Sequence, residues 1–305
     1  MELNEIEAFI AIQRTGNFTR AATALYISQP AISRRIELLE RELGAPLFER
    51  LPAGVRLTEA GWAFLPYAQQ ALAALHDGAA AVHALEEDWP GQAHGSITLA
   101  LVGTLAGTHL TGQLQAFRQT YPLVRLLLRT ARSNEVSELV QQGDALLGLR
   151  YFADPRAGIC SQLVMDEPLQ VVAAAQSRLI AGTPTEPAAL VGISWIGFPT
   201  GAGSSGEPFA HILTRQLLRT GLDGAEMIEI DSLTAQKRLI EADFGIGLLP
   251  ASSVEEEVRL GTMRVLPVDA LTTTVPVVAI YRCQGYLSRA ARHLLEMLTR
   301  QQEGV

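Results

Sequence analysis

The chain has 305 residues, a formal net charge of −8 and 48% hydrophobic residues, which is enough for two or three domains with their own cores. The sequence contains no uncharged apolar stretch of about 18 residues, so no membrane span is predicted. Its acidic start, with Glu2 and Glu5, does not resemble a secretory leader. The cysteines are Cys160 and Cys283 alone, a sparse usage typical of a reducing compartment, so we expect a cytoplasmic protein without a membrane partner.

Three helices are predicted near the N-terminus. Apolar residues recur at three- and four-residue spacing from Leu3 to Thr15, which is the pattern of an amphipathic helix. A short second helix follows over Arg20 to Leu25, with the hydroxyl of Thr19 as its N-cap. Ser28 caps the third helix, whose first turn tolerates Pro30 because the missing N–H has no intrahelical partner there.

The third helix has two chemically distinct faces. An apolar stripe is expected to pack on the first two helices, and it consists of Ile32, Ile36, Leu39 and Leu43. On the opposite face, Gln29 and Arg34 carry the paired donors that match base edges in the DNA major groove, while Ser33 suits phosphates. This division of faces favours a helix that reads DNA.

A two-stranded wing is predicted after this helix. Apolar residues flank a Pro/Gly loop at 52–54, which places Arg50 and Arg56 where they can contact the DNA backbone or the minor groove. The alternative is an ordinary three-helix bundle whose arginines are solvated charges. The capped turn, the polar helix face and the wing occur together, and this combination favours DNA binding.

The spacing of these residues resembles that of the LysR-type transcriptional regulators. The matching positions are Phe9, Asn17, Phe18, Thr19, Ala21, Ala22, Leu25, Ser28, Gln29, Pro30, Ala31, Ser33, Ile36, Leu39, Glu40, Leu43, Gly44, Leu47, Phe48, Arg50, Leu57, Thr58, Ala60 and Gly61. Arg35 departs from the pattern, because the family more often has Gln there. The residues expected to contact DNA are Thr19, Ser28, Gln29, Pro30, Ser33, Arg34, Arg35, Arg50 and Arg56.

The acidity of the chain lies mainly outside the DNA-reading segment. Residues 1–65 carry seven Arg and eight Glu, a net charge of −1, whereas the remainder carries −7. Because affinity for DNA comes largely from neutralising phosphates, the arginines of a nearly neutral segment must gather on one face. We therefore expect modest affinity for each copy and reliance on a dimer or a higher oligomer.

A long helix is predicted to begin at Thr58-Glu59, with Thr58 as its cap and with a bend, not a break, near Gly61 and Pro66. It carries a thin stripe of nearly heptad spacing, which consists of Leu65, Ala68, Leu72, Leu75, Ala79, Val82 and Leu85. Such a stripe suits a two-helix coil between chains; the alternative is packing on the chain's own second domain. The resemblance implies that this helix is the dimer interface and that dimers pair into a tetramer. The acidic, then Pro/Gly-rich stretch 86–95 is interpreted as a hinge.

From Ser96 onward, predicted strands alternate with helices, which indicates an α/β sheet with parallel strands. The segments 168–174 and 239–250 resemble the effector domain of the same family, which implies two α/β lobes joined by crossover strands with a ligand cleft between them. Two positions depart from the family pattern: Asp243 stands where Gly is usual, and Leu146 where Asp is frequent.

Ligands of such sheets bind beyond the carboxyl ends of the strands. The residues expected to bind an effector there are Thr104, Ser133, Asn134, Arg150, Phe198, Ser204 and Ser232. Hydroxyls, amides at helix starts and an arginine are good partners for a carboxylate, so we expect a small carboxylate-bearing effector. The alternative for each Ser and Thr is a plain N-cap. The resemblance implies contacts at Thr104, Ser133 and the region of Phe198 and Ser204.

No convincing catalytic or metal-binding constellation is found in the sequence. Ser204, His211 and Asp231 supply the residue types of a hydrolase triad, but no nucleophile-elbow motif surrounds the serine. The histidines lack paired metal-ligand spacing. Cys160 and Cys283 are interpreted as buried or idle thiols, with a redox switch as the alternative. We expect no enzymatic activity, no metal and no cofactor.

The sequence thus predicts an all-α winged helix-turn-helix domain with a long linker helix, followed by an α/β two-lobed effector domain like those of periplasmic binding proteins. The expected boundaries are 1–58 for DNA binding, 59–90 for dimerisation and 93–305 for the effector domain, with lobe I at about 93–164 and 269–305 and lobe II at about 165–268. The expected partners are double-stranded DNA with a roughly palindromic operator, a small-molecule effector, further copies of the chain and RNA polymerase. The rival functions are a transporter's solute-binding protein and an α/β enzyme.

Overall fold

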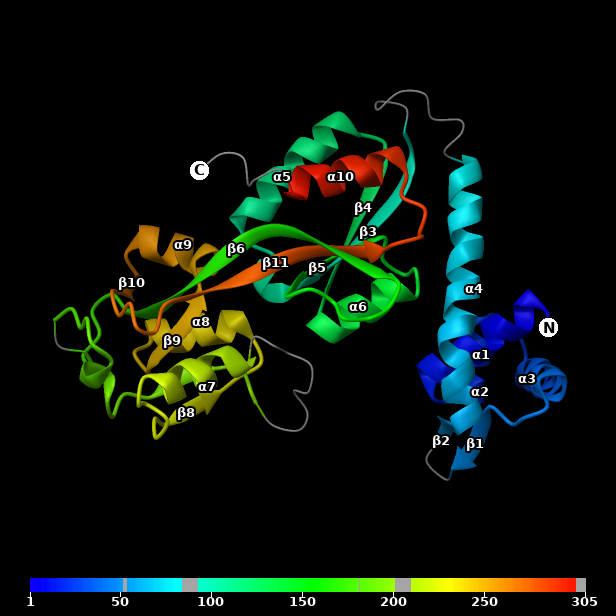
Figure 1. Cartoon of the computed structure of the whole chain (residues 1–305), viewed down its shortest axis with the longest axis horizontal. Helices are drawn as coiled ribbons and strands as arrows, with labels where there is room; N and C mark the ends of the chain where they lie inside the picture. The colour runs from blue at the N-terminus through cyan, green and yellow to red at the C-terminus, as the bar shows by residue number, and fades with distance from the viewer. Residues whose placement is uncertain (52–53, 84–92, 181, 201–209, 300–305) are drawn as a thin grey trace. The chain divides into compact units, whose positions relative to one another are not determined.

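The computed structural model describes residues 1–51, 54–83, 93–180, 182–200 and 210–299 (Figure 1). The chain divides into two compact units: Met1–His83 belongs to the first, and nearly all of the remainder forms the second. Among these described residues, each helix is too short or too polar to cross a membrane.

The first unit is a winged helix-turn-helix. Its elements are α1 (Leu3–Thr15), α2 (Phe18–Ala24), α3 (Gln29–Leu43), β1 (Phe48–Leu51), β2 (Gly54–Leu57) and α4 (Glu59–His83). β1 and β2 form an antiparallel hairpin, which is the predicted wing. The three predicted helices and the wing are confirmed, with α2 displaced by one or two residues.

Asn17, not Thr19, caps α2, so the predicted cap was wrong. The Asn17 side-chain oxygen accepts hydrogen bonds from the backbone N–H groups of Thr19 at 2.8 Å and Arg20 at 3.2 Å. The reason is that the helix already begins at Phe18, which puts Thr19 inside its first turn. Ser28 caps α3 as predicted, because its hydroxyl accepts from a backbone N–H of the first turn.

An aromatic cluster holds the first unit together. The Phe9 ring of α1 lies 5.2 Å, between ring centroids, from both Phe48 of the wing and Phe64 of α4. The first three residues of the predicted apolar stripe of α3 are buried in the same core. Leu43, the fourth, is exposed instead, because it is the last residue of α3.

The start of α4 is fixed to the segment before the wing. The hydroxyl of Thr58 accepts from the Gly61 backbone N–H at 3.0 Å and donates to the Pro46 carbonyl at 2.6 Å, which confirms Thr58 as the cap. The helix then runs without a break through Pro66.

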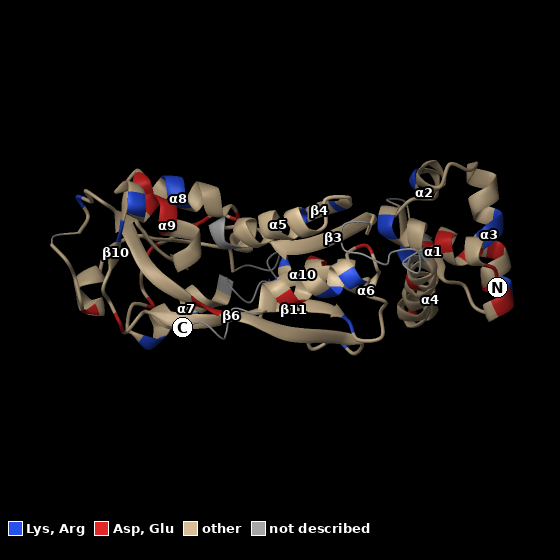
Figure 2. Ribbon diagram, turned by 90° about the horizontal axis from the view of Figure 1, so that it is seen from above, with Lys and Arg blue, Asp and Glu red and all other residues tan. Residues whose placement is uncertain are grey.

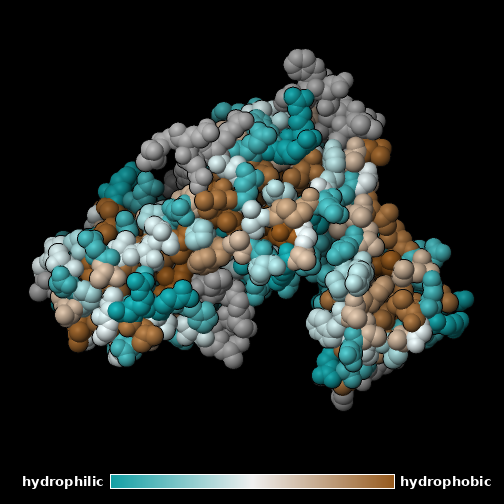
Figure 3. Space-filling model, in the orientation of Figure 1, coloured by the Kyte–Doolittle hydropathy of each residue, from teal (hydrophilic) through white to brown (hydrophobic). Residues whose placement is uncertain are grey.

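The apolar stripe of α4 divides between two environments. Leu65 and Ala68 are buried in the core of the first unit, whereas Leu75 and Val82 are 54% and 65% exposed. Figure 3 shows hydrophobic side chains gathered along this helix. The expected continuation at Leu85 and most of the hinge at 86–95 lie outside the described residues.

The second unit is built on one mixed sheet with the order β4-β3-β5-β11-β6-β9-β7-β8, and β10 pairs with β6. The strands are β3 (Gly95–Val102), β4 (Val124–Ala131), β5 (Leu147–Tyr151), β6 (Ile159–Ala174), β7 (Trp195–Gly197), β8 (Met227–Glu229), β9 (Ile246–Pro250), β10 (Met263–Leu266) and β11 (Thr273–Arg282). The predicted parallel pairing is confirmed in two groups, β4-β3-β5 and β9-β7-β8. Between these groups, β6 and β11 run antiparallel to their neighbours.

The two antiparallel strands connect two lobes. Lobe I holds β3 to β5 with α5 (Thr108–Thr120), α6 (Ser133–Gln141) and α10 (Arg289–Thr299), and lobe II holds β7 to β10 with α7 (Ala210–Arg219), α8 (Leu233–Glu241) and α9 (Ala251–Leu260). Figure 1 shows α5 and α10 on one side of the lobe I strands and α6 on the other. The predicted lobe boundaries near 164 and 269 fall within β6 and just before β11, and their exact positions stay predictions.

The sequence patterns missed several elements around lobe II. β8, α9 and β10 were not predicted, and only the last six residues of β6 were. The first ten residues of β6 mix buried and exposed positions irregularly, with 161–163 all exposed, and include Asp166 and Glu167. They therefore show neither the alternation of a half-buried strand nor the continuous apolar run of a fully buried one. β8 has three residues, which is too short for any periodicity.

The structure shows how Asp243 is accommodated where the family usually has Gly. Its backbone is left-handed, with φ 62°, a conformation that glycine adopts without steric cost. The Asp243 carboxylate accepts from the Ser177 hydroxyl at 2.5 Å and from the Arg178 backbone N–H at 2.7 Å. These charge-assisted bonds offset the backbone strain and fasten the turn after α8 to the turn after β6.

Asp243→Ala is expected to lower the free energy of unfolding by about 2 kcal/mol, because it removes both hydrogen bonds and keeps a Cβ in the left-handed region. Asp243→Gly removes the same bonds but relieves the strain, so its loss should be smaller. Urea unfolding of the two variants measures the difference. Equal stability of the alanine and glycine proteins would contradict this account.

Candidate DNA interface and effector site

The polar face of α3 is open to solvent. Gln29, Pro30 and Arg34 are exposed, and the Gln29 amide donates to the Ser33 hydroxyl at 2.9 Å. Figure 2 shows basic and acidic positions next to one another along the ribbon of α3. The predicted separation of a polar face from a buried apolar face is confirmed, and the polar face presents the groups that base edges recognise.

Tyr26 is a surface residue that the sequence reasoning missed. It is 96% exposed in the turn between α2 and α3, and its backbone has a positive φ of 55°. A tyrosine hydroxyl is a common phosphate partner in DNA complexes. The available signal was the presence of a large aromatic residue in the turn immediately before Ile27-Ser28.

The predicted arginines do not form one uniform patch. Arg56 on the wing pairs across the hairpin with Glu49, with both its Nε and an Nη 2.7 Å from the carboxylate. An Arg35 Nη lies 3.5 Å from the Asn4 carbonyl at the start of α1, so part of its charge is directed toward that helix. Arg50 belongs to β1, but its side chain lies outside the described residues.

Glu40 holds the wing against the reading helix. Its carboxylate accepts from the backbone N–H groups of Leu47 at 2.6 Å and Phe48 at 3.2 Å. Thr19, the remaining candidate contact of this unit, is exposed on α2. The unit therefore presents α2, α3 and the wing in a fixed relation, as a helix-turn-helix reader requires.

In the second unit, four predicted effector residues meet at the carboxyl edge of β3, β4 and β5. Thr104 follows β3 and donates to the Tyr151 hydroxyl at 2.9 Å. Ser133 and Asn134 begin α6, directly after β4. Arg150 and Tyr151 are the last residues of β5, not the first residues beyond it. Thr104 and Ser133 are buried.

Arg150 forms an ion pair that the sequence reasoning did not foresee. Its Nη1 lies 2.6 Å from the Asp154 carboxylate and also donates to the Ser137 hydroxyl, and both charged side chains are almost fully buried. Burial raises the pKa of Asp154, but the hydrogen bonds from Ser137 and the Arg156 backbone, with the charges of Arg150 and Arg156, hold the pKa below its ordinary value. Arg150 therefore organises the edge of lobe I from within.

The matching edge of lobe II lies after β7 and β8. Phe198 follows β7 and is partly buried against the core, and Ser232 caps α8. The Thr200 hydroxyl and backbone N–H lie 3.2 and 3.3 Å from the Glu229 carboxylate. Ser204 lies outside the described residues.

An ion pair joins the two edges. Arg132, the residue before α6 of lobe I, lies 4.0 Å from Asp231, which precedes Ser232 in lobe II. Both side chains are more than half exposed, so the attraction itself is weak. The pair shows that the start of α6 in lobe I lies near the start of α8 in lobe II, so Ser133 and Ser232 lie on facing edges of the two lobes.

A pocket lies on lobe I away from these residues. This pocket, of about 460 Å³ between the end of α5 and α10, is lined by Tyr121, Arg289, Arg292 and His293, among others. The His293 Nδ1 and Tyr121 hydroxyl are 3.2 Å apart, and burial raises the pKa of Tyr121. None of the predicted effector residues lines this pocket.

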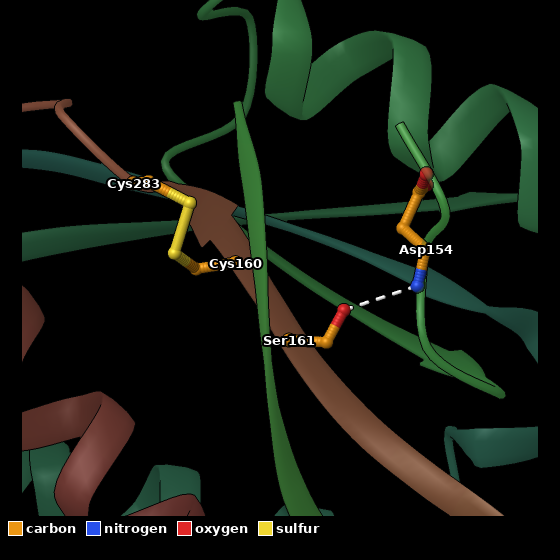
Figure 4. The surroundings of a disulfide bond; sticks show 4 residues. All are labelled: Asp154, Cys160, Ser161 and Cys283. Carbon is orange, nitrogen blue, oxygen red and sulfur yellow. Dashed lines mark hydrogen bonds between the residues drawn. A yellow bond between two sulfur atoms is a disulfide. The ribbon is translucent and has the colours of Figure 1, made fainter. Parts of the chain in front are cut away.

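The two cysteines are not idle thiols, so that interpretation was wrong. Cys160 and Cys283 form a disulfide with their Cα atoms 5.0 Å apart (Figure 4). The reason is the strand pairing: Cys160, the second residue of β6, lies opposite Tyr281 of β11, and Cys283 directly follows β11. The sequence separation of 123 between the cysteines concealed this proximity in the sequence.

The fold and the two sites define a DNA-binding regulator with a ligand-sensing domain. The model of the bacterial regulatory helix-turn-helix proteins of the lysR family matches residues 3–62, and that of the LysR substrate binding domain matches residues 90–303. The chain belongs to the LysR family of transcriptional regulators, which are not enzymes.

Individual relatives agree with this assignment. The HTH-type transcriptional regulator TfdS of Cupriavidus pinatubonensis is 30% identical over 283 residues, or 92% of each chain. A full-length OxyR variant from Pseudomonas aeruginosa shares the fold with a TM-score of 0.73 at 21% identity, covering 98% of this chain and 94% of that one. CbnR in complex with its target DNA has a TM-score of 0.63 at 25% identity, covering 98% and 99%.

Proposed function

We propose that this regulator binds double-stranded DNA by laying the exposed face of α3 in the major groove, with the wing against the backbone. The supporting observation is the outward-facing set of Gln29, Ser33 and Arg34 on a helix whose other face is buried. The structural relative CbnR has been solved with its target DNA. Ser28 and Pro30 lie at the start of the same helix and Thr19 lies in the first turn of α2, and phosphate contacts are common at such helix starts.

We further propose that the chain works as a homodimer through 59–90 and as a tetramer of paired dimers. The exposed part of the α4 stripe, at Leu75 and Val82, supplies apolar surface for a second copy of the helix. Two-fold symmetric reading heads then require a roughly palindromic operator. The working location is the cytoplasm, where RNA polymerase is the partner at the promoter.

The effector proposed for the cleft is a small molecule that carries a carboxylate. The site would be formed by the starts of α6 and α8, with Thr104, Ser133 and Asn134 from lobe I and Phe198, Ser204 and Ser232 from lobe II. Arg150 would support this site by holding α6 in place, since its guanidinium pairs with Asp154 and donates to Ser137. Binding would favour one arrangement of the lobes, which changes subunit packing and the spacing of the DNA-reading heads.

Arg34→Ala is expected to weaken binding to the promoter fragment beside the protein's own gene by about 5- to 150-fold, the equivalent of about 1–3 kcal/mol for a lost base contact. Mobility-shift titrations on that fragment and on a scrambled one measure the effect. Arg259→Ala removes an exposed arginine from α9 and is the charge-matched control that should bind normally. Equal losses on both fragments would show that Arg34 contacts only the backbone and would contradict base reading.

Thr104→Ala and Ser133→Ala are expected to reduce effector affinity, because each removes a hydroxyl from the edge of lobe I. A thermal-shift screen of metabolites first identifies the effector, since a ligand that binds the folded form raises the melting temperature. Isothermal calorimetry then compares the variants with Ser288→Ala, which removes the hydroxyl that accepts from a backbone N–H of α10. If both site variants retain the affinity of the control, the effector does not bind at this edge.

A further inference from the structure

The disulfide lies where the chain leaves lobe I for lobe II and returns. Cys160 is the second residue of β6, Cys283 directly follows β11, and all of lobe II lies between them in the sequence. The bond therefore ties together the two strands that connect the lobes. Forming or breaking this bond therefore adds or removes a crosslink between β6 and β11, the two strands that connect the lobes.

The fold does not depend on the bond to bring these strands together. β6 and β11 pair from Leu169–Thr273 to Ile159–Arg282 with one register shift between Val277 and Val278, and the Cys283 backbone N–H donates to the Gly158 carbonyl at 2.9 Å. The cysteines thus stay adjacent when reduced. Such preorganisation lets the bond open and close without unfolding.

The environment of the pair favours exchange with thiols in solution. Cys283 is exposed and Cys160 is partly buried, so a small thiol can reach the bond from the Cys283 side. In the cytoplasm proposed above, disulfides are characteristically transient and redox-responsive.

Hydrogen bonds connect both ends of the crosslink to α6. The Ser161 hydroxyl, next to Cys160, accepts from the Asp154 backbone N–H at 3.0 Å (Figure 4), and the Asp154 carboxylate holds Arg150. Arg150 in turn donates to Ser137 of α6. From the other strand, the Arg282 guanidinium donates to the Val140 carbonyl near the end of α6 at 3.0 Å.

We propose that Cys160–Cys283 is a reversible thiol–disulfide site that reacts with thiols of the glutathione class, and that its reduction loosens α6 and the Arg150–Asp154 pair. The link to ligand sensing rests on the proposed function, which places the effector at the start of α6. The redox site itself stands on the disulfide and its contacts.

The chemistry is two successive exchanges. A glutathione thiolate attacks the Cys283 sulfur, the S–S bond breaks, and Cys160 leaves as a thiolate that takes up a proton. A second glutathione thiolate attacks the glutathione sulfur of the mixed disulfide and releases Cys283. Two electrons pass from two glutathiones, which end as one glutathione disulfide, and the reverse sequence restores the bond.

The test equilibrates the native full chain in buffers of reduced and oxidised glutathione, traps free thiols with a maleimide and counts them by mass spectrometry. The expected result is a reversible passage between no free thiol and two per chain while the protein stays folded. Hydrogen–deuterium exchange in 133–141 and 150–161 should be several-fold faster in the reduced form, with β7 and β9 unchanged.

The Cys160→Ser/Cys283→Ser double variant is the control and should show the faster exchange in both buffers. A bond that glutathione reduces only after denaturation would overturn the proposal in favour of a structural crosslink. Unchanged exchange in α6 on reduction would overturn the coupling. Neither readout uses DNA or an effector, so failure here is distinct from failure of the proposed function.

Discussion

Arg150→Met should lower the free energy of unfolding by about 3–5 kcal/mol, because it leaves the Asp154 carboxylate buried without its cation. The Asp154 side chain is fully buried, and its second carboxylate oxygen also fixes the Arg156 backbone N–H at 2.8 Å. Urea unfolding of the full chain, followed by circular dichroism, measures the loss. The effect should appear in the transition of the effector domain.

Two further variants separate pairing from burial. Arg150→Met/Asp154→Leu replaces the pair by apolar side chains and should regain much of the lost stability, since a buried pair is often no better than apolar packing of similar volume. Arg156→Met is the matched single control: its guanidinium lies 3.9 Å from Asp154 and is 29% exposed, so its loss should be much smaller. A double variant no more stable than Arg150→Met would contradict the account.

The same ion pair makes the stability of the effector domain depend on pH in the acid range. The pKa of folded Asp154 lies below its ordinary value of 3.8, so its ionisation stabilises the fold fully above that pH. The contribution disappears as pH falls through the lower, folded pKa. The Asp154→Asn variant lacks this titrating group. Its free energy of unfolding should therefore change less than that of the natural protein as the pH is lowered from 4 until the protein unfolds.

Gly61→Ala is the second substitution with a large expected effect. A Cβ at this position of α4 would lie 2.2 Å from the Leu47 carbonyl oxygen and 2.8 Å from a methyl group of Leu57. Both neighbours belong to the junction that Thr58 caps, and one is backbone that cannot rotate away. We expect a loss of about 3 kcal/mol in the first unit, at the upper end of overpacking costs, together with weaker DNA binding.

Gly78→Ala is its control within the same helix. No heavy atom lies within 4 Å of a Cβ built there, so the change should stabilise α4 by about 0.5–1 kcal/mol through helix propensity. Thermal unfolding and mobility-shift assays on both variants decide the matter. If the two variants unfold alike, the close approach of α4 to Leu47 is not what holds the wing in place.

The DNA-reading unit could be predicted from sequence because its signals are local. The cap at Ser28, the faces of α3 and the turn of the wing each depend on residues within one or two helical turns. The errors there are local as well: Asn17 and Thr19 are both good caps, and only the position of the first helical turn decides between them. The direction of Arg35 toward Asn4 depends on packing between helices, which spacing does not show.

The candidate effector site was harder to predict because its contacts are distant in sequence. The positions of Thr104, Ser133 and Phe198 could be predicted because each follows a predicted strand. The partners of Arg150 could not, because Asp154 lies in a loop and Ser137 in α6. The disulfide depends on the register of β6 with β11, and only part of β6 had a recognisable pattern. Such pairings follow from the assembled sheet and not from any window of sequence.

Lobe II is connected to the rest of the chain through two neighbouring antiparallel strands, β6 and β11. In the sequence, lobe II is an insertion within lobe I, and the two joints between the lobes, in β6 and β11, lie side by side in the sheet. A graft that exchanges the segment between these joints for that of another member of the family would replace the lobe II half of the proposed effector site while keeping the reading head and α4. We expect such an exchange to change the ligand that acts at an unchanged promoter.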